Sequence, residues 1–149
     1  LQDRAIAGDL LLELLIEADP SDREMCARRL REMSQAPKRL LRFLALDAPN
    51  VARPILADNK GLDDSELAHV ASVGGPAHRA AIAARREIGP AVTTALAASG
   101  DAAAMALLLE NSSAKLSELA VDLIVGASRE AARLPPLLLL REELRPAHA

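Results

Sequence analysis

The sequence predicts an all-α protein, a short right-handed α-solenoid of stacked helix pairs with about 25–27 residues per repeat and an N-terminal helical cap. Two observations predict this fold. Of the 149 residues, 31 are Ala, 27 are Leu and one is aromatic, whereas β-sandwiches and barrels rely on Val, Ile, Thr and aromatic residues. The apolar residues also keep the i, i+3/i+4 spacing of helices, and short apolar helices recur along the chain.

Three helices are expected in the N-terminal third. The first covers residues 5–18 and ends before Pro20. Ser21 is predicted to cap the second helix, with Glu24 completing a capping box, and Pro37 is predicted to begin the third.

These elements divide the chain into two parts. We expect residues 1–47 to form a helical cap or degenerate repeats, and residues 48–149 to form the regular helical repeats. The whole chain is expected to be one continuous domain. Because it opens with Leu1 rather than Met, it is also expected to be a fragment of a longer protein.

The repeats are pairs of short helices. The first helices of the pairs align on four apolar anchors: Ile55, Ile82, Leu107 and Leu138. The second helices have their own start signals in Asp63, Pro90 and Ser117. Helices of about ten residues are marginal alone, so they are expected to stack on their neighbours.

The alignment also predicts a charge ladder. Three residues after the anchors stand side chains of alternating sign: Asp58, Arg85, Glu110 and Arg141. Equivalent positions of adjacent repeats are neighbours in a stacked array. We therefore expect Arg85 to lie within ion-pair reach of Asp58 or Glu110.

Charge and composition restrict the compartment and the partners. The formal net charge is −3, which gives no general attraction to nucleic acid or to an anionic membrane. The single cysteine, Cys26, excludes an internal disulfide, and no residues have the spacing of zinc ligands. No apolar run reaches the roughly 18 residues of a membrane helix. A cytoplasmic protein without metal or cofactor is expected.

Four segments carry a family resemblance: PAHRAAIAARR (76–86), IGPAV (88–92), LDDSEL (62–67) and ALLLEN (106–111). Through them the stretch from residue 48 to residue 127 resembles the bacterial domain-of-unknown-function family 2336, a set of HEAT-like helical repeats. The resemblance implies HEAT-like helix pairs within a longer bacterial cytoplasmic protein. The family has no established catalytic residues, so the resemblance assigns none to this chain.

A basic stretch is the segment with the strongest functional character. Residues 23–53 hold eight Lys or Arg against three acids, while residues 1–22 hold one Arg against six acids. The candidate anion or nucleic-acid contacts in it are Arg28, Arg29, Arg39 and Arg42. Three interpretations remain open. The stretch is a solvated face paired with the acidic first helix (Asp9, Glu13, Glu17), it binds an acidic protein, or it binds a phosphate backbone.

No group of residues predicts catalysis. Cys26 has no candidate base close in sequence and is expected to be an inert thiol, although the neighbouring arginines could lower its pKa. Ser112 and Lys115 have an S-x-x-K spacing, but the segment is typical of a turn between helices. The three histidines, His69, His78 and His148, form no metal pattern.

The sequence therefore predicts a non-enzymatic protein-interaction or regulatory scaffold module. Its expected partners are another protein and the remainder of its own longer chain, with no membrane partner. Arg79, Arg85 and Arg86 are the candidate partner-binding residues. The alternative is a nucleic-acid-binding HEAT-like domain that uses the basic helices of residues 23–53.

Overall fold

The computed structural model describes residues 2–141, with side chains described from residue 6 onward. Every regular element in this range is a helix, so the all-α prediction is confirmed. The ten helices are α1 (Gln2–Ile16), α2 (Pro20–Leu30), α3 (Lys38–Ala45), α4 (Pro49–Asp58), α5 (Asp64–Val73), α6 (Pro76–Ala83), α7 (Pro90–Ala98), α8 (Ala102–Glu110), α9 (Glu118–Ala127) and α10 (Leu134–Leu139).

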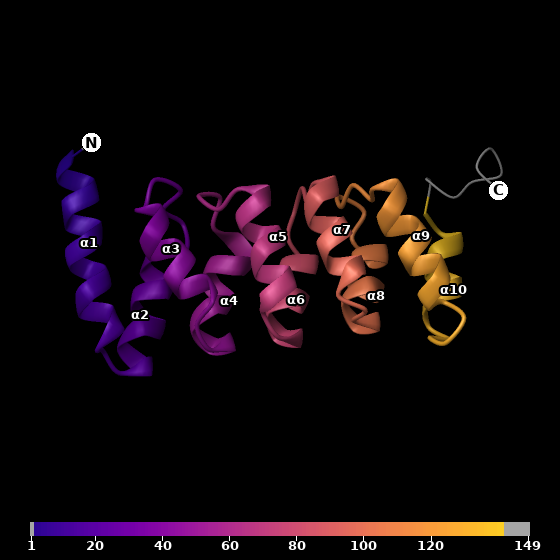
Figure 1. Ribbon diagram of the computed structural model, residues 1–149, viewed down its shortest axis with the longest axis horizontal. Coiled ribbons are helices and arrows are strands. Elements are labelled where there is room, and N and C mark those ends of the chain that lie inside the picture. The colour runs from indigo at the N-terminus through magenta and orange to yellow at the C-terminus, as the bar shows by residue number, and fades with distance from the viewer. Residues whose placement is uncertain (1, 142–149) are drawn as a thin grey trace.

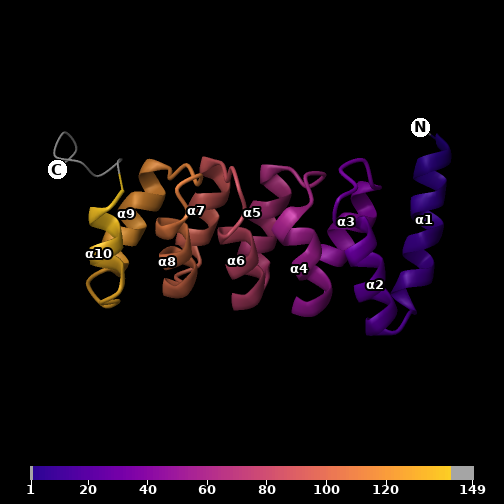
Figure 2. The same cartoon turned by 180° about the vertical axis from the view of Figure 1, so that it is seen from behind.

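The helices form two rows along one elongated array (Figure 1). The odd-numbered helices make one row and the even-numbered helices the other, and the view from behind shows the same order (Figure 2). In the even row each helix packs on the next, from α2 through α4, α6 and α8 to α10. In the odd row α5, α7 and α9 stack closely, as do α1 and α3, whereas α3 and α5 approach each other least.

Helix starts follow the predicted signals, with one exception. Asp63 and Glu66 form a capping box at α5, Ser117 Oγ accepts the Ala120 amide at 2.9 Å at α9, and Pro90 lies in the first turn of α7. The predicted cap at Ser21 is wrong. The N-cap of α2 is Asp19, because Pro20, which lacks an amide hydrogen, occupies the first turn.

The core runs between the two rows as aliphatic side chains. One buried cluster extends from α1 to α8, and a second joins α7, α8, α9 and α10. Three of the four predicted anchors, Ile55, Ile82 and Leu138, are buried. In α8 the neighbouring Leu108 is fully buried, whereas the predicted anchor Leu107 is only partly buried. The predicted register was therefore one residue out in this helix.

No helix among residues 2–141 is both long enough and apolar enough to cross a lipid bilayer.

Candidate functional site

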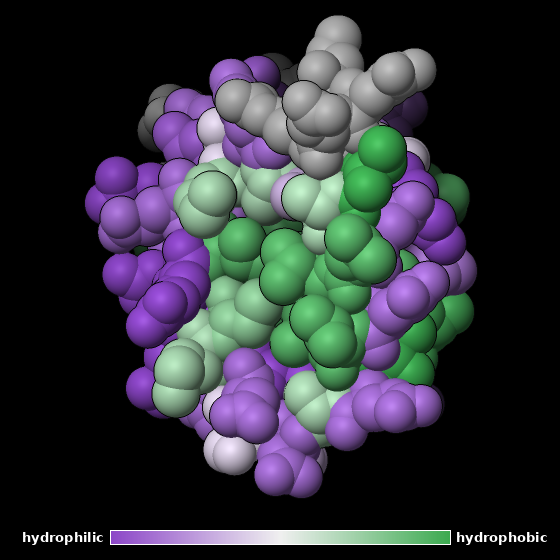
Figure 3. Space-filling view, turned by 90° about the vertical axis from the view of Figure 1, so that its left-hand side faces the viewer, coloured by the Kyte–Doolittle hydropathy of each residue, from purple (hydrophilic) through white to green (hydrophobic). Residues whose placement is uncertain are grey.

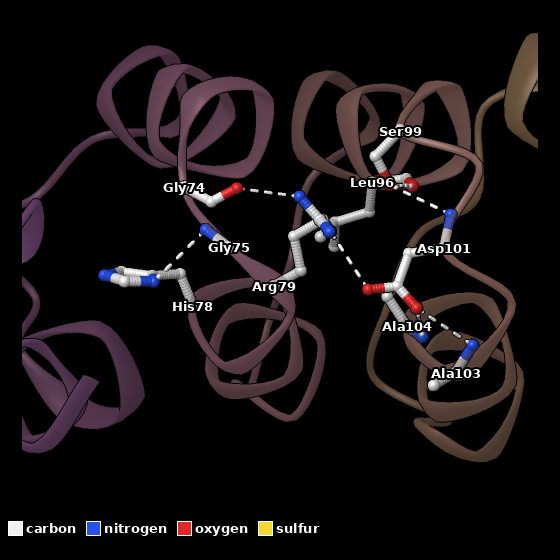
Figure 4. Close-up of polar contacts among 9 residues, drawn as sticks. All are labelled: Gly74, Gly75, His78, Arg79, Leu96, Ser99, Asp101, Ala103 and Ala104. Atoms are coloured by element: carbon white, nitrogen blue, oxygen red, sulfur yellow. Dashed lines mark hydrogen bonds and ion pairs between the residues drawn. The ribbon is translucent and has the colours of Figure 1, made fainter. Parts of the chain in front are cut away.

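Arg79 and Asp101 form a polar junction where the turns of neighbouring helix pairs meet (Figure 4). The Arg79 guanidinium donates from Nε to Asp101 Oδ2 at 3.0 Å and from Nη1 to the Gly74 carbonyl at 2.7 Å. Asp101 Oδ1 accepts the amides of Ala103 and Ala104 at the start of α8. The junction thus ties α6 to the next pair of helices.

The pKa of Asp101 reflects this setting. Burial raises the pKa of the Asp101 carboxyl, but the hydrogen bond from Arg79 and those from the backbone amides together outweigh burial. The net effect holds the pKa below its usual range, so the carboxylate is charged at neutral pH.

The same junction occurs earlier in the chain. Arg23 in α2 donates from Nε to Asp47 Oδ2 at 2.7 Å, and its Nη1 binds the Ala18 carbonyl, five residues back as in Arg79. Each of these arginines stands three residues after the proline that begins its helix. Both junctions are therefore structural links between helix pairs.

His78 provides a further link on the other side of α6 (Figure 4). Its Nδ1 accepts the Gly75 amide at 3.3 Å, so the proton resides on Nε2, which lies 2.7 Å from the Asp47 carbonyl. The imidazole is buried and satisfied at both nitrogens. It is a structural histidine.

A carbonyl ladder, made of Asn59, Arg85, Asn111 and Arg141, joins the C-terminal ends of the even helices. Each member reaches back to the backbone of the preceding even helix. The bonds run from Asn59 Nδ2 to the Leu30 carbonyl (2.7 Å), from Arg85 Nη2 to the Asn59 carbonyl (2.7 Å), from Asn111 Nδ2 to the Arg85 carbonyl (2.6 Å) and from Arg141 Nη1 to the Asn111 carbonyl (2.8 Å). These carbonyls lie at or just beyond the C-terminal ends of the helices, where no amide four residues on continues the helical pattern.

The carbonyl ladder corrects the predicted charge ladder. Arg85 makes no ion pair with Asp58 or Glu110 within residues 2–141. The neighbouring amide residues, Asn59 and Asn111, hold the positions that face it. Burial lowers the pKa of Arg85, while Asp58 and Asp64 act in the opposite direction from a distance.

The three predicted partner-binding residues differ in their surroundings. Arg79 and Arg85 direct their guanidinium groups to atoms of this chain. Arg86 is exposed and has no hydrogen bond or ion pair among the described residues. Partner binding by these residues stays a prediction, and Arg86 is the one whose charged group is free for it.

Most of the basic stretch is paired with acids of the same chain. Arg28 contacts Glu24 at 2.8 Å, Arg39 contacts Asp9 of α1 at 2.9 Å, and Arg42 contacts Glu66 of α5 at 2.6 Å. Of the four candidate anion contacts, Arg29 is the one without such a partner in the described chain. The Arg39 pair agrees with the interpretation of a basic face set against the acidic first helix.

One opening in the odd row lies between α3 and α5, and we call it the α3–α5 groove. It has a volume of about 300 Å3. Its lining residues are Arg42, Ala45, Leu46, Leu62, Ser65, Glu66, His69 and Val70. Ala45, Leu62 and Val70 are buried and apolar, so they form a floor, while Leu46 and His69 are exposed at the mouth.

An ion pair crosses one side of the groove. Glu66 is almost fully buried, with Oε1 accepting from Arg42 Nε and Oε2 accepting the Asp63 amide at 2.8 Å. The Arg42 side chain is 55% exposed, and its terminal nitrogens have no partner among the described residues. The groove therefore combines an apolar floor with a cation that can still bind an anionic group.

The remaining candidate groups do not converge on a catalytic arrangement. Burial raises the pKa of the Cys26 thiol and outweighs the opposite influence of Arg29, so the thiol is protonated at neutral pH. Ser112 is exposed in the turn between α8 and α9, where the Lys115 amide binds the Ile88 carbonyl. Groups of three or more potential metal ligands are absent from residues 2–141, and His148 lies outside the described residues.

Comparison with known proteins gives one match. Residues 51–149 match DUF2336, described as an uncharacterised protein conserved in bacteria. The chain belongs to this family. No curated protein and no solved structure matched in the corresponding comparisons.

The DUF2336 segment begins inside α4 and includes α5 to α10. One wall of the α3–α5 groove therefore lies within the family segment, and the other wall, α3, precedes it. Sequence reasoning found Arg42 but missed the groove and Glu66 as part of it. The available signal was the Asp63–Glu66 capping box, which locates the start of α5 but says nothing of the second helix that Glu66 contacts.

Proposed function

We propose that this DUF2336 chain is a non-enzymatic interaction or regulatory scaffold module of a cytoplasmic bacterial protein, built as an α-solenoid of HEAT-like helix pairs. The stacking of helices in two rows supports the solenoid. Such arrays present extended surfaces to partners. The observation that carries the proposal is the α3–α5 groove, where the odd row opens and exposes an apolar floor.

The proposed occupant is an aliphatic side chain of an acidic segment in a partner protein. The buried floor of Ala45, Leu62 and Val70 suits an aliphatic group. Arg42 lines the groove beside this floor, and its terminal nitrogens remain free donors although its Nε is paired with Glu66. A carboxylate next to the inserted side chain would pair with Arg42.

Nucleic-acid binding through residues 23–53 is the alternative, and the ion pairs of Arg28 and Arg39 weigh against it. Each pair already neutralises a charge that a phosphate would need. The two functions differ in sensitivity to nuclease and salt, so one experiment separates them.

The test is affinity capture from a bacterial lysate, with and without nuclease, followed by mass spectrometry. Leu46→Glu places a carboxylate at the mouth of the groove, where it would repel an acidic segment. Val73→Glu is the matched control, because Val73 is similarly exposed on α5 but does not line the groove. We expect a protein retained by the wild type and by Val73→Glu after nuclease treatment, and lost with Leu46→Glu. Equal retention by both variants, or elution of nucleic acid alone, would contradict the proposal.

A further inference from the structure

Helix α1 is apolar on the side that faces away from the rest of the molecule. Gly8 and Leu15 are buried toward the array. On the opposite side Ile6, Leu10 and Leu14 follow at intervals of one turn and are 59%, 57% and 71% exposed. A contiguous row of exposed apolar side chains is typical of an interaction surface, and no part of residues 2–141 covers this side of α1.

Helix α2 extends this surface. Met25 is 56% exposed, and Arg29 lies one turn further along the same side. Ala27 and Leu30 mark the opposite, inward side of α2, because both are buried. Figure 3 looks at this end of the array and shows a hydrophobic centre bordered by hydrophilic residues.

We call this surface the N-terminal face and define it by Ile6, Leu10, Leu14 and Met25 with the charged residues Glu13, Glu17 and Arg29. All three charged residues are exposed and have no ion partner within residues 2–141. Carboxylates on α1 and a guanidinium on α2 thus border one apolar centre. A face that carries both signs can complement a copy of itself.

We propose that two copies of this chain associate through their N-terminal faces in an isologous dimer. The apolar centres bury each other, and Glu13 and Glu17 of one copy approach Arg29 of the other. The proposal does not rest on the proposed function, because the α3–α5 groove stays open in such a dimer.

The opposite end of the array also exposes apolar side chains, those of Leu119, Val125, Leu139 and Leu140, but its charges do not suit the N-terminal face. Ala120 and Ile124 turn one side of α9 toward the core, and the exposed Glu118 and Asp122 lie on the other side. Head-to-tail stacking would set these carboxylates against Glu13 and Glu17. Like charges placed opposite each other disfavour an interface.

The size of the N-terminal face sets the expected affinity of the two copies for each other. With 15 residues, α1 is about 22 Å long, and two neighbouring helices are roughly 20 Å wide. This is a small interface, typical of weak association. We expect a dissociation constant on the order of 10–100 µM.

Sedimentation equilibrium of the full chain tests the proposal. The protein concentration runs from about 1 to 300 µM, which brackets the expected dissociation constant. Leu10→Glu should weaken dimerisation at least tenfold. Leu139→Glu should leave it unchanged, because Leu139 is 85% exposed at the other end. Circular dichroism checks that both variants stay folded. A wild-type chain that is monomeric at 300 µM, or self-association that Leu139→Glu abolishes and Leu10→Glu does not, would overturn the proposal.

A charge exchange tests how the copies meet. Arg29→Glu makes the face wholly acidic, and Glu13→Arg with Glu17→Arg makes it wholly basic, so each variant alone should dimerise more weakly than the wild type. Mixed together, they should form a heterodimer that weakens as salt is added. A mixture no more associated than its separate components would refute the proposed pairing.

Discussion

Arg79 and Asp101 show what the buried charged residues of this protein do. Both side chains are largely shielded, at 16% and 14% exposure. Arg79→Ala should lower the free energy of unfolding by about 2 kcal/mol, because it leaves Asp101 shielded and short of one charged partner. Urea denaturation measures the effect. Arg86→Ala, at an exposed arginine without a partner, should change stability by no more than about 0.5 kcal/mol. Equal effects of the two variants would show that the junction has no structural role.

The lowered pKa of Asp101 predicts how stability depends on pH. In the unfolded chain the pKa of Asp is about 3.9, and in the folded protein the pKa of Asp101 is lower. The stability that this carboxylate supplies is therefore complete above about pH 4 and is lost as the pH falls through the folded-state pKa.

Unfolding of the wild type and of Asp101→Asn, measured from pH 7 to pH 3, checks this prediction. The wild type should be the more stable protein at pH 7, and the difference should narrow below about pH 4. The comparison cancels the titration of other carboxylates that the two proteins share. A difference that is constant or that grows as the pH falls would contradict it.

The helices themselves were largely predictable, because their start signals are local. Asp63, Pro90 and Ser117 are followed by their helices as expected. Ser21 was misread because two cap signals overlap there. Pro20 has a fixed φ and no amide hydrogen, so the first turn begins with it and places the N-cap at Asp19.

The links between helices were less predictable, since they use backbone groups that have no sequence signature. The spacing of the anchors predicted an ion pair of Arg85 with Asp58 or Glu110, whereas Arg85 contacts Asn59 and Asn111. It could not show that the acceptors are carbonyls, nor that a one-residue shift puts Asn111 rather than Glu110 at the contact. The α3–α5 groove was missed for a similar reason, because it results from a gap between two helices.

Helix α1 depends on a close approach that a glycine allows. A Cβ added at Gly8 would lie 2.6 Å from Cβ of Pro37, whose ring cannot move aside. Gly8→Ala should therefore push α1 away from the start of α3 and loosen it, although Ala favours the helix itself. Hydrogen exchange should be faster in α1 and unchanged in α7 to α9. Slower exchange in α1 would mean that helix propensity dominates over the contact.

Over the whole molecule the polar links recur every second helix pair. Arg23 and Arg79, Asn59 and Asn111, and Arg85 and Arg141 are each separated by about 52–56 residues and make matching bonds. The sequence predicted a repeat of one helix pair, because aliphatic residues dominate the sequence and recur with every helix pair. The longer period is visible only in the contacts, because few residues carry it.

The division of the core into two clusters predicts that the array does not unfold as a uniform unit. Ile124 is fully buried in the cluster formed by α7 to α10 and packs with residues such as Met105 and Leu134. Ile124→Ala should cost about 2–4 kcal/mol by leaving a cavity. In a stacked array, each element contacts only its neighbours, so the loss should remain local.

Native-state hydrogen exchange resolves the prediction along the chain. With Ile124→Ala, protection should fall in α8, α9 and α10, while α3 and α4 keep their wild-type exchange rates. Ile55→Ala, at an equally buried position in the other cluster, should give the reverse pattern. If either variant accelerated exchange equally in all helices, the two clusters would unfold together. The array would then be one cooperative unit despite its divided core.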